Sequence, residues 1–177
     1  LAQERVHYAL NVLRLKNAQA IAAFNGTGQL AEAMLVVTGR RAAQLKVLSV
    51  QQCAAKNPLQ TILVQAISRG DRMDHSIQKA VELGVSAIQP VFSSRCEVKL
   101  SGDKLEKRRQ QWQSIVINAC EQSGQNWVPE VASIQTYAEW LEQFSATSSY
   151  AICLDPLASK ALPDLPQPKP QEPVHIL

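Results

Sequence analysis

The order of apolar and polar positions changes character about one third of the way along the chain. Before that point, apolar and polar residues partly alternate in three segments, 20–24, 30–37 and 43–50. The breaks between these segments, at 25–28 and 38–41, contain Gly, Asn and Arg, which is typical of turns between antiparallel strands. We therefore expect a small antiparallel sheet or β-barrel, preceded by a short helix around residues 7–13.

From residue 59 onward the pattern becomes an alternation of strands and helices. Residues 61–67 form a near-continuous apolar run, which is typical of a parallel strand buried on both faces. Asp74 is expected to cap the helix that follows, and Gly84 to end it. The other expected elements are strands at 87–92, 150–154 and 174–177 and helices at 103–123 and 136–144. This order predicts an α/β fold with an open parallel sheet.

The polar segment 51–58 separates the two patterns and ends in proline. We place the domain boundary there, with a small β-barrel domain at 1–56 and an α/β domain at 57–177. Residues 1–58 carry seven Lys/Arg and two acids, a net charge of +5, whereas residues 59–177 carry eleven and thirteen, a net charge of −2. The basic front hints at a polyanionic partner, although a solvated basic face without a ligand is nearly as common.

The overall composition is that of an ordinary soluble globular protein, with 46% hydrophobic and 19% charged residues among 177. No stretch reaches the roughly 18 apolar residues of a membrane span, and the start lacks the layout of a secretion signal, so a cytoplasmic location is expected. The four cysteines form no C-x-x-C pair and none of the three histidines stands at metal-ligand spacing from them. This predicts reduced thiols and no metal site.

Polar residues follow three of the predicted strands at their carboxyl ends. Arg69 and Arg72 follow the first strand of the α/β domain, Arg95 follows the second, and Asp155 with Pro156 follows a later one. In open parallel sheets, ligands bind in the crevice beyond these ends, so we expect the three exits to line one crevice. Arg69 and Arg72 suit phosphate binding, with a solvated loop as the equal alternative. For Arg95, the alternative is an interdomain or dimer salt bridge.

Several motifs, in one order and with consistent spacing, resemble those of a bacterial enzyme family. They are Ser-Arg-Gly-Asp-Arg-Met-Asp at 68–74, Ile-Gln-Lys-Ala-Val-Glu-Leu-Gly-Val at 77–85, Phe-Ser-Ser-Arg-Cys at 92–96, Val-Lys-Leu at 98–100, Trp-Gln at 112–113, Ala-Cys-Glu-Gln-Ser at 119–123 and Val-Pro at 128–129. In the front part, His7, Val-Leu-Arg at 12–14 and Phe-Asn-Gly at 24–26 continue the match. Over essentially the whole chain, these motifs resemble the ribosomal RNA small-subunit methyltransferase E family.

The resemblance implies both a fold and an activity. Members of the family are S-adenosylmethionine-dependent enzymes that methylate N3 of a uridine at position 1498 of 16S rRNA. They combine a front PUA-like β-barrel that helps to bind RNA with a trefoil-knotted, SPOUT-type α/β domain that binds the cofactor. They act as homodimers whose active sites draw on the dimer interface. The expected partners are therefore 16S rRNA in the small ribosomal subunit and a second copy of the chain, without a membrane.

The resemblance and the strand ends together suggest roles for individual residues. The catalytic candidates are Arg95, Glu121 and Gln122, the cofactor-binding candidates are Leu154, Asp155 and Pro156, and the RNA-binding candidates are Arg14, Arg40, Arg41, Arg69 and Arg72. For Glu121 and Gln122, a hydrogen-bond network at the end of a helix is an equally good explanation. Lys79 and Glu82 are expected to pair with each other, and the basic run at 104–109 to be a solvated helix face.

The chain departs from the family pattern at both of its ends and at two positions between them. The chain ends at Leu177, before the Gly-Pro-Glu-Gly-Gly loop and the Leu-Gly-x-Arg-x-Leu-Arg segment that complete the family's cofactor pocket and knot, and its front lacks about one strand. Both domains are therefore expected to be incomplete. Ser94 stands where the family often has Glu, and Gln125 where it often has Arg, which removes a possible phosphate contact.

These observations predict an S-adenosylmethionine-dependent rRNA (uracil-N3)-methyltransferase. The alternative from another class is a non-catalytic RNA-binding or ribosome-assembly protein with the same architecture. A Gly-Pro-Glu-Gly-Gly loop in a longer protein would exclude that alternative. A dinucleotide-dependent α/β enzyme is disfavoured because no G-x-G-x-x-G motif follows a predicted strand.

Overall fold

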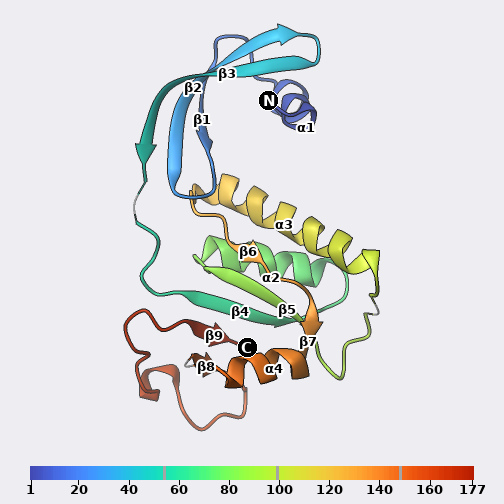
Figure 1. The fold of residues 1–177 in the computed structure, drawn as a ribbon, viewed down its shortest axis with the longest axis vertical. Coiled ribbons are helices and arrows are strands. Elements are labelled where there is room, and N and C mark those ends of the chain that lie inside the picture. The colour runs from blue at the N-terminus through green and yellow to red at the C-terminus, as the bar shows by residue number, and fades with distance from the viewer. Residues whose placement is uncertain (54, 99, 148) are drawn as a thin grey trace. The chain divides into compact units, whose positions relative to one another are not determined.

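The computed structural model describes residues 1–53, 55–98, 100–147 and 149–177, which fall into two compact units, 1–56 and 57–177 (Figure 1). Lys99, part of one motif above, and Ala54, inside the predicted boundary segment, lie outside the described residues. None of the helices in the described ranges is long and apolar enough to cross a membrane.

The first unit is a three-stranded antiparallel sheet with helical turns before it. The strands β1 (Ala20–Phe24), β2 (Gln29–Gly39) and β3 (Ala42–Gln52) pair in the order β1-β2-β3. This confirms the antiparallel front part expected from the alternation. The helical segment consists of α1 (Gln3–His7) and a π-helical turn η1 (Tyr8–Val12).

The helix begins at Gln3, so the predicted start at residue 7 was wrong. The reason is the burial of Val6, which is only 3% exposed and packs with Leu35 and Ala43 in the core of this unit. The polar residues around Val6 hid this contact, because the pattern shows a single apolar position there and no full helical repeat.

The second unit is built on a parallel sheet. Its strands are β4 (Thr61–Ala66), β5 (Ala87–Phe92), β6 (Glu130–Val131), β7 (Gln135–Thr136), β8 (Tyr150–Ile152) and β9 (Val174–Ile176). They follow the order β6-β5-β4-β9-β8, with β7 also pairing with β5, and the strand pairs are parallel. The parallel sheet predicted from the sequence is therefore confirmed. The sequence pattern did not show β6 and β7, because two residues are too few for a periodicity.

Three helices cover the two faces of this sheet. Helices α2 (Asp71–Glu82) and α3 (Asp103–Ser123) lie on one side of β4 and β5, and α4 (Tyr137–Ser145) lies on the other (Figure 1). The buried stripe of α3 comprises Trp112, Val116, Ala119 and Cys120, and that of α2 comprises Met73, Ile77 and Val81. Both helices were predicted, and α3 has the predicted bounds.

The start of α2 differs from the prediction. Asp74 does not cap the helix, because α2 begins three residues earlier at Asp71. Its N-cap is Gly70, whose φ of +63° is readily adopted by glycine, and no side chain caps the first turn. Gly84 ends the helix as predicted: it has a φ of +86°, and its N–H donates to the carbonyl of Val81.

Trp140 on α4 fixes that helix to the sheet, because it is 4% exposed and packs with Val64 and Val91. We expect Trp140→Ala to lower the free energy of unfolding of the second unit by about 3–5 kcal/mol, the usual cost of deleting a buried aromatic side chain. Leu141→Ala on the same helix is the matched control, because Leu141 is 43% exposed. Urea unfolding followed by circular dichroism measures both, and equal effects of the two substitutions would refute this assignment.

The capping box at the start of α4 predicts a pH dependence. The N–H and hydroxyl of Thr136 both donate to Glu139 at 2.7 Å, and these bonds hold the pKa of Glu139 below its ordinary 4.5. The stabilisation is therefore fully present above pH 4.5 and is lost as the pH falls through the lowered pKa. We expect Glu139→Gln to remove this part of the acid dependence of unfolding, and Glu142→Gln on the same helix to leave it in place.

Candidate functional site

The exits of β4 and β5 come together at the carboxyl edge of the sheet. The N–H of Ile67 donates to the carbonyl of Val91 at 2.9 Å, and the thiol of Cys96 donates to the carbonyl of Ile67 at 3.3 Å. Farther out, the Arg69 guanidinium lies 3.5 Å from the Glu97 carboxylate. These contacts hold the loops after β4 and β5 side by side, as the parallel pairing requires.

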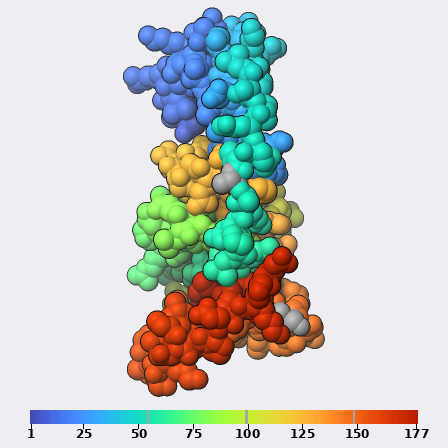
Figure 2. Space-filling model, turned by 90° about the vertical axis from the view of Figure 1, so that its left-hand side faces the viewer, coloured from blue at the N-terminus to red at the C-terminus, as the bar shows by residue number. Residues whose placement is uncertain are grey.

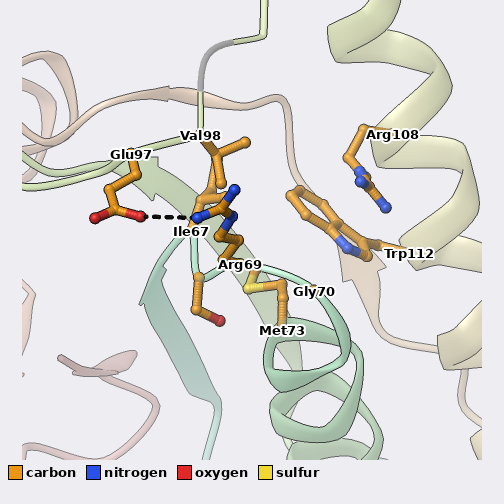
Figure 3. Close-up of a pocket in the computed structure, with 9 residues that line it drawn as sticks. Ile67, Arg69, Gly70, Met73, Glu97, Val98, Arg108 and Trp112 are labelled. Atoms are coloured by element: carbon orange, nitrogen blue, oxygen red, sulfur yellow. Dashed lines mark hydrogen bonds and ion pairs between the residues drawn. The ribbon is translucent and has the colours of Figure 1, made fainter.

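A pocket of about 410 Å³ lies at this place. It is lined by Ile67, Ser68, Arg69, Gly70, Met73, Glu97, Val98, Arg108 and Trp112. Figure 3 shows the Arg69–Glu97 pair on one side and the Arg108 and Trp112 side chains, which come from α3, on the other. The pocket therefore joins three segments: the start of α2, the first half of α3 and the loop after β5.

Where α3 lines the pocket, an arginine lies over a tryptophan ring. Nearby, two buried polar atoms have no hydrogen-bond partner among the described residues. The Arg108 guanidinium carbon lies 5.8 Å from the centroid of the Trp112 ring, within cation–π range. Among the described residues, the indole Nε1 of Trp112 and the hydroxyl of Ser68 are buried and have no hydrogen-bond partner. Buried polar groups in folded proteins nearly always have a partner, so these two mark the pocket as a place for a polar ligand.

Of the RNA-binding candidates in this unit, Arg69 lines the pocket and Arg72 does not. Both are exposed. Arg95 is also exposed, in the loop after β5 and close in sequence to Glu97, but its side chain is not among those lining the pocket. The structure thus brings the β4 and β5 exits together as predicted, and it leaves Arg95 exposed and outside the pocket lining.

The other two catalytic candidates lie at the far end of α3. Glu121 is half-buried and Gln122 is exposed, both in the last turn before Gly124 ends the helix. At about 1.5 Å per residue, Glu121 lies roughly 20 Å along the helix from Arg108. One copy of the chain therefore does not bring Glu121 and Gln122 into the pocket.

The cofactor candidates follow β8, at the same carboxyl edge but two strands away from β4, and they do not line this pocket, contrary to the expectation that all three exits share one crevice. The N–H of Leu154 donates to the carbonyl of Leu177 at 2.9 Å, which extends the pairing of β8 with β9. Asp155 accepts a hydrogen bond from the N–H of Leu157 and shapes a turn. Leu154 and Leu157 are 67% and 91% exposed, so the loop offers bare apolar surface. Figure 2 shows the segment after β8, in orange-red, at the surface of the second unit.

The front-unit candidates are all exposed. Arg40 and Arg41 occupy the turn between β2 and β3, and Arg14 follows η1 with a φ of +53°. The side-chain amide of Asn11 and the ring of His7 are hydrogen-bonded, with 2.9 Å between Asn11 Nδ2 and His7 Nδ1. Within the described ranges, no group of three or more His, Cys, Asp or Glu side chains is placed to hold a metal ion.

The structure tests the two expectations for charged residues on the helices. Lys79 Nζ lies 2.7 Å from Glu82, so these two do pair with each other. Arg109 binds Glu106 at 2.7 Å and also donates to the carbonyl of Val131, which ties α3 to β6. The expectation of a solvated face at 104–109 was therefore wrong for Arg109, which is half-buried. Hydrogen bonds, first from Arg109 and then from Gln110, lower the pKa of Glu106 to about 2.

Gln125, which stands where the resembled family often has Arg, has a local structural contact. Its side-chain amide donates to the carbonyl of Val81 at the end of α2, and its own N–H donates to Cys120 at the end of α3. The amide therefore joins the carboxyl-terminal ends of the two helices, away from the pocket.

Apart from Arg69, none of the lining residues was predicted as a site residue, and four of those missed are polar or aromatic: Ser68, Glu97, Arg108 and Trp112. Arg108 was counted within a solvated basic run and Trp112 within an apolar stripe. The available signal was their spacing, because residues four apart on a helix lie on the same face.

Comparisons with known proteins agree over both units. The RNA methyltransferase domain family matches residues 55–177, and the RNA methyltransferase PUA domain family matches residues 1–48. A Buchnera aphidicola protein named ribosomal RNA small subunit methyltransferase E is 30% identical over 94% of this chain, which spans 68% of that protein. The Synechocystis protein of the same name is 32% identical over 92% of the chain, which spans only 52% of it.

Solved structures show the same similarity. The ribosomal RNA small subunit methyltransferase E from Neisseria gonorrhoeae, bound to S-adenosyl methionine, has a TM-score of 0.89 and 39% identity, covering 99% of this chain and 72% of that one. A putative methyltransferase from Legionella pneumophila, in complex with the same cofactor, has a TM-score of 0.87 and 34% identity, with the same coverage.

An antiparallel front sheet followed by a parallel α/β sheet, matched over both units, is the architecture of an RNA methyltransferase. Within that class, the chain belongs to the ribosomal RNA small subunit methyltransferase E family. The resemblance inferred from the sequence motifs is therefore confirmed. The chain spans about half to three quarters of the length of these relatives.

Proposed function

We propose that this chain works in S-adenosylmethionine-dependent methylation of N3 of a uridine, at position 1498, in 16S rRNA of the small ribosomal subunit. The observation that carries the proposal is the similarity to the Neisseria enzyme, which extends over 99% of the chain at 39% identity and a TM-score of 0.89. A similarity that runs through both units supports a shared RNA substrate as well as a shared cofactor.

The chemistry of the target sets what the protein must provide. N3 of uracil carries a proton that is lost only in alkaline solution, so methylation requires this proton to be drawn off or the developing anion to be stabilised. Arg95 is suited to the second task, because a guanidinium presents a planar fork of donors to a carbonyl or phosphate oxygen. Its exposed position beyond β5 lets it reach a bound nucleotide.

The exit of β8 fits one side of an adenosine site. Exposed Leu154 and Leu157 offer apolar surface, and the loop leaves the sheet from the carboxyl end of β8, at the same edge as the loops after β4 and β5. Ligands of open parallel sheets bind beyond the carboxyl ends of the strands. S-adenosylmethionine supplies the electrophilic methyl group when it is bound, while Leu154, Asp155 and Pro156 hold its adenosine by apolar and backbone contacts.

The remaining assignments concern partners. The front unit contributes Arg14, Arg40 and Arg41 to rRNA binding, and Arg69 and Arg72 add contacts from the α/β unit. Glu121 and Gln122 lie far along α3 from the pocket, so a role for them in catalysis requires a second copy of the chain, and we propose a homodimer. We propose the cytoplasm as its location, because the proposed substrate is ribosomal RNA.

The test is methyl transfer to 16S rRNA in small ribosomal subunits that lack the modification. We expect incorporation from S-adenosylmethionine and a stop of reverse transcription next to the modified uridine, because an N3 methyl group blocks base pairing. Arg95→Gln should lower kcat/KM by about 10- to 100-fold, the value of one hydrogen bond to a charged group. Lys79→Gln removes the same charge from an exposed structural pair and should leave the rate unchanged.

Failure of methyl transfer while the protein binds both cofactor and rRNA would instead support a non-catalytic RNA-binding or ribosome-assembly protein. A methyl group found on another uridine atom or another base would contradict the N3 assignment while leaving the enzyme class intact.

The front unit makes a separate prediction about salt. Each phosphate contact that is removed should lower the slope of log K against log salt by about 0.7 for single-stranded RNA. We expect Arg40→Gln with Arg41→Gln to lower the slope by about 1.4, measured by fluorescence anisotropy with a labelled 16S rRNA fragment. The pair Lys104→Gln and Lys107→Gln on α3 has the same charge change and should leave the slope as it is.

A further inference from the structure

We propose that the pocket between the start of α2 and the first half of α3 is a binding subsite for one RNA phosphodiester group. Its walls are Ser68, Arg69, Gly70, Arg108 and Trp112, with Glu97 at the rim. The inference rests on the proposed function for the identity of the ligand, because RNA is the source of the phosphodiester. It adds a defined site that the strand-end arginines alone do not specify.

The first argument is the unpaired donor in the wall. Trp112 is 2% exposed and lines the pocket, and among the described residues its indole N–H has no acceptor. In Figure 3, the indole nitrogen lies on the side of the ring that faces Gly70 and the start of α2. The hydroxyl of Ser68, also buried and unpaired, adds a second donor. An indole nitrogen can only donate, so its partner must be an acceptor such as an anionic oxygen.

The second argument is that the N-terminus of α2 has no side-chain cap. This helix has 12 residues, and no side chain caps its first turn. The free N–H groups of a helix start and the positive end of the helix dipole together favour an anion. A side-chain carbon placed on Gly70 would meet nothing within 4 Å, so the space beside the N-cap of α2 is open.

The third argument is the charge around the pocket. Arg69 and Arg108 come from two different elements and both line it, while Glu97 is the one acidic lining residue. The first turn of α2 carries two acids, the exposed Asp71 and the half-buried Asp74, and neither is part of the lining. One carboxylate is too few for a cation site, whereas two guanidinium groups suit the oxygens of a phosphate.

Glu97 acts as a weak internal competitor for Arg69. Their side chains are 76% and 84% exposed and 3.5 Å apart, a geometry that contributes little to stability. A phosphate can therefore replace the Glu97 carboxylate on Arg69 without disturbing the core. The volume of about 410 Å³ leaves room for the adjoining ribose.

The NMR signal of the Trp112 indole N–H reports directly whether a ligand occupies the pocket. The chain has three tryptophans, at 112, 127 and 140, so a ¹H–¹⁵N spectrum shows three indole signals, and Trp112→Phe identifies the one of interest. We expect uridylyl-uridine, which has one phosphodiester, to shift the Trp112 signal saturably. Inorganic phosphate should do so more weakly, and uridine, which has no phosphate, should not. The Trp140 signal, from the other face of the sheet, should stay in place.

Two substitutions outside the indole keep the test valid if Trp112→Phe fails to fold. Arg108→Gln should weaken uridylyl-uridine binding about tenfold, the share of one charge-assisted hydrogen bond. Lys107→Gln, its neighbour with the same charge change but no place in the lining, should not weaken it. Glu97→Gln should strengthen binding about two- to threefold, because it releases Arg69.

The outcomes separate this proposal from the proposed function. No shift of the Trp112 signal with either phosphate compound would overturn the subsite and leave methyl transfer, measured separately, unaffected. A shift with inorganic phosphate alone would assign the pocket to a small free anion and overturn the RNA ligand. An equal shift with uridine would show recognition of the base, which also overturns it. Saturable binding of uridylyl-uridine with the Arg108 and Glu97 effects supports it even if methyl transfer fails.

Discussion

The parallel pairing of β4 with strands on both of its sides is the constraint on which the second unit depends. β4 pairs with β5 over residues 62–66 and with β9 over residues 61–63. Because both neighbours run in the same direction, the loops after these strands all leave at one edge of the sheet. The phosphate pocket and the loop after β8 are consequences of this single arrangement, although they lie on different sides of the reversal in strand order.

Helix α3 is fixed to the sheet and thereby positions one side of the pocket. Gln113 donates to the carbonyl of Pro129 at 3.0 Å and accepts the N–H of Val131 at 2.9 Å, so one side chain fixes the helix to β6. Arg109 adds a bond to the same strand. With this face of the helix held, the neighbouring residues Arg108 and Trp112 have a defined direction, and a pocket wall can be built from two side chains. The basic run is thus divided between a structural arginine and a ligand-facing one.

Much of the fold could be predicted because its signals are local. The bounds of β1, β5 and α3 follow from short apolar runs and from one long amphipathic repeat. The order of the strands in the sheet could not be predicted, because it depends on contacts between residues far apart in sequence. The pocket could be predicted only in part. Arg69 directly follows a strand, which is a local signal in the sequence. Arg108 and Trp112 reach the pocket through the packing of α3, which depends on contacts far apart in the sequence.

The central position of β9 has a consequence for synthesis of the chain. β4 ends at Ala66 and its partner begins at Val174, so the ribosome must add about 100 residues before the sheet can close. At the usual 5–20 residues per second this takes roughly 5–20 s. During that time the β9 side of β4 is an open edge with Ile62 and Leu63 on it, which is a site for pairing with other nascent chains. The time for which this edge stays open is therefore set by how fast the segment between the two strands is synthesised.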